Sequence, residues 1–133
     1  MVQIAGKYKV VENKNFYEFL LGLGIPEERA KEGNKTGGES EILVDGEKIT
    51  FKDEHGHVIE FVLDKEVEEK RGDLVFLSTA KLDGNTLTVI AKAADGNRAS
   101  LRTWTFTDSE LNFTITIEKD GKNLTASRKY KRI

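Results

Sequence analysis

The residues best suited to bind a ligand lie near the C-terminal end of this sequence, where an arginine and a tyrosine are separated by one residue. Side chains alternate along a strand, so Arg128 and Tyr130 share one face, while Lys129 and Lys131 share the opposite, hydrated face. A guanidinium presents a planar fork of donors that matches a carboxylate, and a phenol hydroxyl on the same face can add one hydrogen bond. The pair therefore indicates a site for a carboxylate or a similar anion.

Arg128 shares its face with the apolar residues Leu124 and Ala126, which predicts that its guanidinium points inward. A buried guanidinium without a partner costs roughly several kcal/mol, and a carboxylate ligand in an internal cavity would remove that cost. The residues alone leave two other interpretations open. Arg128 could pair with an internal acid, or it could belong to a basic tail at the surface.

A second arginine, Arg102, lies in the segment 98–107, which alternates less regularly. Counting back from a turn at Asp108 places Arg102, Trp104 and Phe106 on the inner face. From there Arg102 could reach the head group of a ligand through water, and Trp104 could pack against an apolar chain. The alternative is that Trp104 is ordinary core and that Arg102 faces solvent.

Apolar side chains at alternating positions are predicted to form the wall of a cavity. Burying a chain of about sixteen carbons at ~0.8 kcal/mol per methylene gives a gross stabilisation on the order of 10 kcal/mol, before the cost of association. Apolar burial would therefore dominate affinity, and Arg128 would set the ligand's orientation and the preference for anions. The apolar residues predicted to contact the ligand, besides Trp104 and Phe106, are Phe16, Ile42, Phe51, Phe61, Phe113 and Ile115.

Asp-Gly pairs separate runs that are rich in β-branched and aromatic residues, and such pairs favour tight hairpin turns. Between two of these turns, the segment 111–117 alternates apolar and polar residues with the period of two that is typical of a strand with one hydrated face. About ten short strands are predicted, which is typical of an antiparallel sandwich or an up-and-down barrel. The turns are at Asp45-Gly46, Asp83-Gly84, Asp95-Gly96 and Asp120-Gly121.

The segment 15–25 departs from this alternation, because its apolar residues recur with helical spacing. Asn15 is the predicted N-cap of this helix. Pro26 is expected to open a second short helix that ends at Gly33. Two helices of this size cannot cross a parallel sheet repeatedly, so we expect them to cover one end of a barrel. The residues with helical spacing are Phe16, Phe19, Leu20 and Leu23.

The composition predicts one globular domain that spans residues 1–133, with 38% apolar residues. The net charge of −2 provides no basic field for nucleic acid, which is therefore not an expected partner. The chain has no cysteine, and its first residues lack the apolar core of a signal peptide, so the expected location is the cytoplasm. A monomer is the default expectation.

The sequence contains no motif that is typical of an enzyme, such as a nucleophile elbow, a P-loop or a dinucleotide fingerprint. His55 and His57 flank Gly56 in a predicted turn without an evident third ligand, so neither a metal nor a cofactor is expected. The charged segment 65–73 is most simply a solvated hairpin.

The order of these features resembles the intracellular lipid-binding protein family, which includes the fatty-acid-binding proteins and the cellular retinoid carriers. The resemblance covers essentially the whole chain, and the Arg-x-Tyr of the last segment matches the family's motif for the ligand carboxylate. Residues 38–42 and the Lys-Arg-Ile ending are most similar to the liver-type branch. The segments that carry the resemblance are Gly6-Lys7-Tyr8-Lys9, Asn15-Phe16, Leu23-Gly24-Ile25-Pro26-Glu27-Glu28, Leu82-Asp83-Gly84 and Ser127-Arg128-Lys129-Tyr130-Lys131-Arg132-Ile133.

The resemblance implies a ten-stranded antiparallel up-and-down, clam-like barrel with a two-helix lid inserted after the first strand. It also implies a carrier, not an enzyme, that binds a long-chain fatty acid or similar hydrophobic anion in a water-containing cavity, with the carboxylate held by Arg128 and Tyr130. The sequence departs from the family at one point. Many fatty acid carriers have a second arginine where Trp104 stands here, and Arg102 is the nearest candidate.

Other functions within the same fold stay open. A bile acid or a retinoid suits the same anchor, and a module that binds membranes through its lid is a further alternative. In family terms Lys31 and Lys35 would lie near the lid, where they could contact anionic membranes transiently during ligand transfer.

Overall fold

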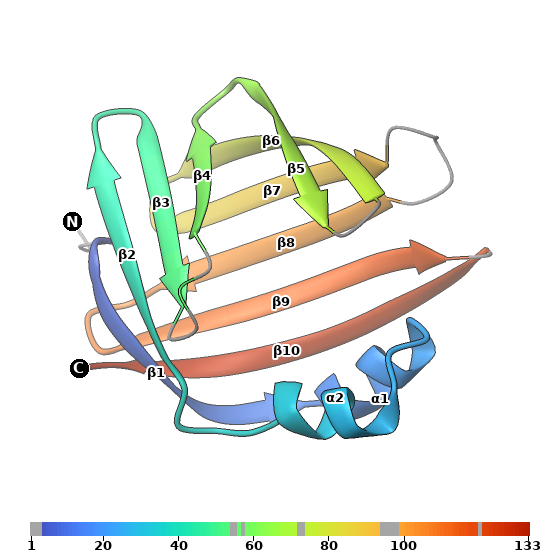
Figure 1. Ribbon diagram of the computed structural model, residues 1–133. Helices are drawn as coiled ribbons and strands as arrows, with labels where there is room; N and C mark the ends of the chain where they lie inside the picture. The colour runs from blue at the N-terminus through green and yellow to red at the C-terminus, as the bar shows by residue number, and fades with distance from the viewer. Residues whose placement is uncertain (1–3, 54–55, 57, 72–73, 94–98, 120) are drawn as a thin grey trace.

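The computed structural model describes residues 4–53, 56, 58–71, 74–93, 99–119 and 121–133. Ten antiparallel strands form one sheet that curls into a nearly closed barrel, with two short helices between the first and second strands (Figure 1). The strands are β1 (Gly6–Lys14), β2 (Glu39–Asp45), β3 (Lys48–Asp53), β4 (Val58–Val62), β5 (Glu66–Arg71), β6 (Leu74–Asp83), β7 (Thr86–Ala93), β8 (Ala99–Phe106), β9 (Glu110–Lys119) and β10 (Lys122–Arg132), and the helices are α1 (Phe16–Gly22) and α2 (Glu27–Gly33).

The strand order is that of an up-and-down barrel, β4-β3-β2-β1-β10-β9-β8-β7-β6-β5, in which β1 pairs with both β2 and β10. The two outer strands, β4 and β5, share no ladder among the described residues. Near them, Leu63 forms an isolated bridge with Ala80, and the Asp64 amide donates to the Ala80 carbonyl at 2.8 Å. The predicted clam-like barrel is confirmed, and the sandwich is excluded.

The Asp-Gly turns join strands as predicted where the structure describes them. Asp45 pairs with Lys48 across the first hairpin, and Gly46 has a φ of 61° that suits glycine. Gly84 has the same φ in the turn between β6 and β7. The predicted turns at Asp95-Gly96 and at Asp120 lie outside the described residues.

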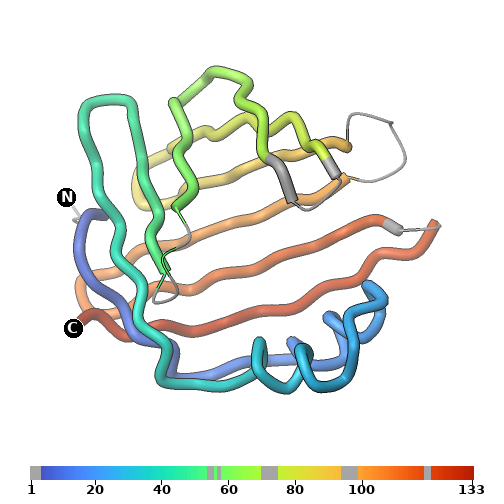
Figure 2. The backbone as a smooth tube through the Cα atoms, in the orientation of Figure 1, coloured from blue at the N-terminus to red at the C-terminus, as the bar shows by residue number. Residues whose placement is uncertain are grey.

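The two helices lie side by side across β1 and β10 at one end of the barrel (Figure 2), and α1 packs on the inward face of β9 and β10 that carries Ile115, Leu124 and Ala126. Pro26 precedes α2 as predicted, and α2 ends at Gly33. Asn15 is the N-cap residue of α1, as predicted. It has a left-handed φ of 58°, and its side chain forms no capping hydrogen bond but donates to the Thr125 carbonyl on β10 at 2.8 Å.

Inner faces follow the alternation of the sequence. On β8, Arg102, Trp104 and Phe106 are all buried, as predicted. On β6, for which the sequence indicates no clear inner face, Ser78 and Ala80 are buried, and Leu77 faces outward. The main core fills the barrel around Tyr8, Ile42, Ile49, Phe61, Ala80, Leu87, Val89, Trp104, Phe106 and Leu111, and a second cluster under the helices is built on Phe19, Ile115 and Ala126.

The charged segment 65–73 is not simply a solvated hairpin. Its first part forms β5, and on that strand Glu69 is only 8% exposed, while Glu68 faces solvent. Within the described ranges, no helix has the length and apolar character needed to cross a membrane.

Candidate functional site

Arg128 lies on β10 opposite Asn13 of β1, and its guanidinium lies beneath the helices. Its Nε donates to Asn13 Oδ1 at 2.7 Å, and its Nη2 donates to the carbonyl of Gly33 at the end of α2. The guanidinium carbon lies 4.1 Å from the centre of the Phe16 ring on α1. Asn13 Nδ2 also donates to the Asn34 carbonyl at 2.6 Å, just after α2. Arg128 therefore links the barrel wall to both helices.

The partners of Arg128 are all neutral. Amide oxygens and the carbonyl end of a helix stabilise a cation, but they do not neutralise it. Among the described residues no carboxylate forms an ion pair with Arg128, so the interpretation of an internal acid partner finds no support in this part of the chain. The bonds to Asn13 and Gly33 leave further N–H donors of the guanidinium for an anion.

An outer cavity of about 470 Å³ opens beside Arg128, between α2, the segment that leads into β2 and the end of β3. An inner cavity of about 170 Å³ lies within the barrel. Ser40 and Asp53, which pair across the β2–β3 ladder, line both cavities. These two residues are therefore the part of the wall that the two cavities share. The outer cavity is also lined by Val10, Glu32, Gly33, Lys35, Thr36, Gly37, Gly38 and Glu39.

The wall of the inner cavity is largely aromatic. The Trp104 ring lies 4.9 Å from the Phe51 ring and 5.0 Å from the Phe113 ring, measured between centroids. Pockets for small organic ligands usually hold at least about 300 Å³. A long apolar chain must therefore displace some of these side chains as it enters. Tyr8, Ile42, Lys52, Ile59, Leu111 and Tyr130 complete the lining with Ser40 and Asp53.

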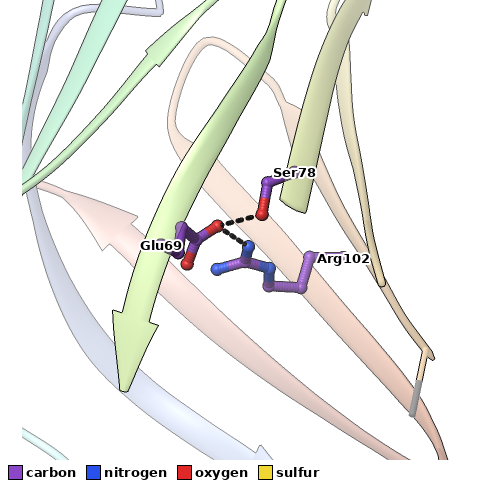
Figure 3. Close-up of polar contacts among 3 residues, drawn as sticks. All are labelled: Glu69, Ser78 and Arg102. Atoms are coloured by element: carbon purple, nitrogen blue, oxygen red, sulfur yellow. Dashed lines mark hydrogen bonds and ion pairs between the residues drawn. The ribbon is translucent and has the colours of Figure 1, made fainter. Parts of the chain in front are cut away.

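Arg102 belongs to a buried polar cluster that the sequence analysis missed (Figure 3). Its Nη2 forms an ion pair with Glu69 Oε1 on β5, and Ser78 Oγ on β6 donates to the same oxygen at 2.6 Å. The guanidinium carbon lies 5.4 Å from the Phe61 ring centre and 5.8 Å from that of Trp104. Arg102 is 4% exposed, so the solvent-facing alternative is wrong.

A signal for this cluster was present in the sequence. Val67 and Glu69 share one face of β5, and Val67 packs against the main core. Alternation from Val67 would have placed Glu69 inside, although the surrounding charges favoured a solvated segment.

The structure distributes the predicted ligand contacts over several places. Ile42, Phe51, Trp104, Phe113 and Tyr130 line the inner cavity, whereas Arg128 lines the outer one. The two members of the Arg-x-Tyr pair therefore line different cavities. The remaining predicted contacts are Phe16 beside Arg128, Phe61 beside Arg102, Phe106 against Tyr8 and Ile115 under α1.

The end of the barrel away from the helices is fixed by Tyr8 and Arg132. The Tyr8 hydroxyl donates to the Ile4 carbonyl at 2.7 Å, and Arg132 lies over the Tyr8 ring at 4.9 Å. Burial raises the pKa of Tyr8 above its ordinary value, and the charge of Arg132 opposes that rise.

The described part of the chain contains no group of three His, Asp or Glu side chains placed to hold a metal ion. His55 and His57 lie outside the described residues.

No family model matches the chain. It is 31% identical over 137 aligned positions to a fatty acid-binding protein from Tyrophagus putrescentiae, and the match covers 99% of each chain. It is 32% identical over 89 positions to the liver fatty acid-binding protein of Mus musculus, covering 63% of this chain and 69% of that protein. The crystal structure of the fatty acid-binding protein from brain tissue of Drosophila melanogaster superimposes with a TM-score of 0.78 at 31% identity, covering 94% of this chain and 95% of that one.

Proposed function

This chain belongs to the fatty acid-binding protein family, and from that premise we propose that it is a non-enzymatic carrier of a long-chain fatty acid or a similar hydrophobic anion. One observation carries the proposal for this chain. Arg128 lies beneath the helices with only neutral partners among the described residues, next to a cavity that shares Ser40 and Asp53 with an inner space rich in aromatic side chains. A cation without a carboxylate partner suits a carboxylate ligand.

In the proposed complex the carboxylate lies between Arg128, which lines the outer cavity, and the hydroxyl of Tyr130, which lines the inner one. The apolar chain runs inward along Trp104, Phe51 and Phe113, which line the inner cavity. Apolar burial supplies most of the affinity, because each buried methylene contributes ~0.8 kcal/mol. Arg128 sets the orientation of the ligand and the preference for an acid over an alcohol.

The test is displacement of a fluorescent fatty-acid analogue from the delipidated protein by hexadecanoic acid and by hexadecanol. We expect Arg128→Gln to weaken binding of the acid by about tenfold or more, because a hydrogen bond to a charged group is lost. Binding of the alcohol should hardly change. Lys129→Gln is the matched control, since it removes one positive charge from the adjacent position, where Lys129 pairs with Glu110 at 2.9 Å.

Two outcomes would contradict the proposal. If neither hexadecanoic acid nor hexadecanol displaces the analogue, the fatty-acid assignment fails, and bile acids and retinoids become the next ligands to assay. If Arg128→Gln and Lys129→Gln affect the acid equally, Arg128 is not the anchor.

The proposal places the carrier in the cytoplasm as a monomer, with transient membrane contact through α1 and α2. The lysines at this end are paired with nearby glutamates, Lys31 with Glu27 at 3.3 Å and Lys35 with Glu32 at 2.8 Å. These pairs offset much of the positive charge near the helices, so we expect contact with anionic vesicles to be weak and to disappear as salt is added.

A further inference from the structure

The aromatic side chains of the inner cavity include a contact that crosses the barrel. Trp104 is on β8 and Phe51 is on β3, and in the sheet these two strands are separated by β9, β10, β1 and β2. Their ring centroids are nevertheless 4.9 Å apart. The Trp104 ring also lies 5.0 Å from the ring of Phe113 on β9, measured between centroids. The three rings therefore connect two walls of the barrel that are not neighbours in the sheet.

Trp104 lies at one boundary of the inner cavity. The residues that line this cavity come from β1 to β4 and from β8 to β10. On β7, Leu87 pairs with Trp104 across the ladder, is fully buried and belongs to the same core cluster. The Arg102 guanidinium carbon lies 5.8 Å from the centre of the Trp104 ring. Trp104 therefore separates the cavity from the core along β6 and β7, where Ala80 and Val89 are buried.

The inner cavity is too small for a long acyl chain. At roughly 30 Å³ per methylene group, a volume similar to that of a water molecule, its volume of about 170 Å³ holds about six methylene groups. The chain of hexadecanoic acid is much longer than this. Trp104 is the largest side chain of the lining and contacts two other aromatic residues of the same wall, so its displacement disrupts both ring contacts. A close-packed core yields to such a displacement only at a cost in free energy.

We propose that Trp104 determines chain-length specificity by closing the inner cavity, so that methylene groups beyond those that fill the cavity add little to affinity. The inference rests on the proposed carrier function, with the carboxylate at Arg128. A methylene group that is buried in open apolar space raises affinity about fourfold. One that displaces Trp104 also breaks the contacts of the indole with Phe51 and Phe113, and this cost offsets the gain. A smaller apolar side chain at position 104 removes the obstacle.

The experiment measures displacement of the fluorescent analogue by saturated acids of increasing length, from octanoic to octadecanoic acid. In wild type, affinity should rise about fourfold per methylene among the short acids and less than about twofold per methylene beyond dodecanoic acid. In Trp104→Leu the fourfold steps should continue, so the affinity ratio of hexadecanoic to dodecanoic acid should rise at least about tenfold over wild type. Both acids are measured on the same variant, so a general loss of stability cancels in this ratio. An unchanged ratio would overturn the inference, as would fourfold steps throughout the series in wild type.

Phe106→Leu is the matched control. Phe106 is fully buried on the same face of β8, two positions after Trp104, but it packs against Tyr8 and is not among the residues that line the outer or the inner cavity. This variant should keep the ratio of hexadecanoic to dodecanoic acid within about twofold of wild type. An equal rise in Phe106→Leu and Trp104→Leu would mean that any loosening of the core admits longer chains, and Trp104 would have no specific role.

Trp104→Phe tests the same inference if Trp104→Leu does not fold. It keeps an aromatic ring beside Phe51 and Phe113 but is smaller than the indole. The ratio of hexadecanoic to dodecanoic acid should therefore rise by about threefold or more. A folded Trp104→Phe protein with the wild-type ratio would refute the role of Trp104.

The failure of the inference can be told apart from the failure of the carrier function. If wild type binds none of the acids, the proposed function fails, and the inference falls with it. If wild type binds the acids in a way that depends on Arg128, but Trp104→Leu leaves the dependence on chain length unchanged, only the role of Trp104 is refuted.

Discussion

Arg128 and Arg102 are in opposite electrostatic situations within one barrel. Arg102 is paired with a carboxylate and surrounded by Phe61 and Trp104, whereas Arg128 has only amide and carbonyl oxygens and an aromatic ring as described partners. The cost of a buried charge depends on its partner, so the same side chain serves structure at one site and is available for a ligand at the other.

Tyr8 provides a prediction about stability and pH. Its pKa is raised by burial, so the folded state holds the phenol proton more tightly than the unfolded state does. Above about pH 10 the unfolded state gives up this proton first, and the free energy of unfolding should fall as the pH rises through the raised pKa of Tyr8. Tyr8→Phe should make this fall shallower, and denaturant unfolding between pH 8 and about pH 11 measures it. Identical slopes for both proteins would contradict the expectation.

At the residue scale, local alternation predicts which face a side chain occupies but not what it meets there. The inward positions of Arg102, Trp104 and Phe106 follow from period two along one strand. The contact between Glu69 and Arg102 depends on how β5, β6 and β8 come together, which a charge-rich segment does not reveal. The hydrogen bond from Arg128 to the Gly33 carbonyl likewise depends on how α2 packs on the barrel, because the two residues are 95 positions apart in the sequence.

At the scale of elements, Asn13 holds the helices to the barrel. Its side-chain amide accepts from Arg128 and donates to the Asn34 carbonyl, so a single residue of β1 connects β10 with the end of α2. The helices themselves were predictable from their apolar spacing and from Pro26. The contacts that hold the helices to the barrel were not predictable. The side chain of Asn15, which the sequence pattern assigns to capping α1, donates instead to the Thr125 carbonyl on β10.

Asn13→Asp tests whether Arg128 binds the ligand carboxylate in addition to linking β10 to the helices. The change places a carboxylate 2.7 Å from the position of the Arg128 Nε, which offsets the charge of the guanidinium, and it also removes the amide that donates to the Asn34 carbonyl. If Arg128 binds the ligand carboxylate, affinity for hexadecanoic acid should fall by about tenfold, and affinity for hexadecanol should change little. Asn112→Asp, on the exposed face of β9, controls for the added negative charge. Equal acid affinity in wild type and Asn13→Asp would argue against Arg128 as the anchor.

At the scale of the whole molecule, the sheet is continuous except between β4 and β5. The order of the strands and the Asp-Gly turns made the up-and-down arrangement predictable, since each hairpin pairs neighbours in sequence. The position of the discontinuity was not predictable, because it depends on the curvature that ten strands accumulate. Exposed Glu66 and Glu68 on β5 place charge along this edge, which discourages pairing with another chain.

Hydrogen exchange should reveal this discontinuity. Amides on the outer edges of β4 and β5 lack a ladder partner among the described residues, so they should exchange faster than amides of β9, which has a paired strand on both sides. Exchange followed by mass spectrometry on peptides from 58–71 and 110–119 measures the difference. Equal protection of the two regions would indicate that β4 and β5 are joined more tightly than the structure shows.

The position of Trp104 means that the intrinsic tryptophan fluorescence of this protein should respond to ligand binding. It is the single tryptophan of the chain, it is 8% exposed, and its indole lies between the tilted rings of Phe51 and Phe113 on the wall of the inner cavity. All of the tryptophan fluorescence of the protein therefore comes from the part of the cavity wall along which a lipid chain would lie. When a chain replaces cavity water and moves these rings, the wavelength and yield of that emission should change, so that loading and unloading could be timed in unlabelled protein.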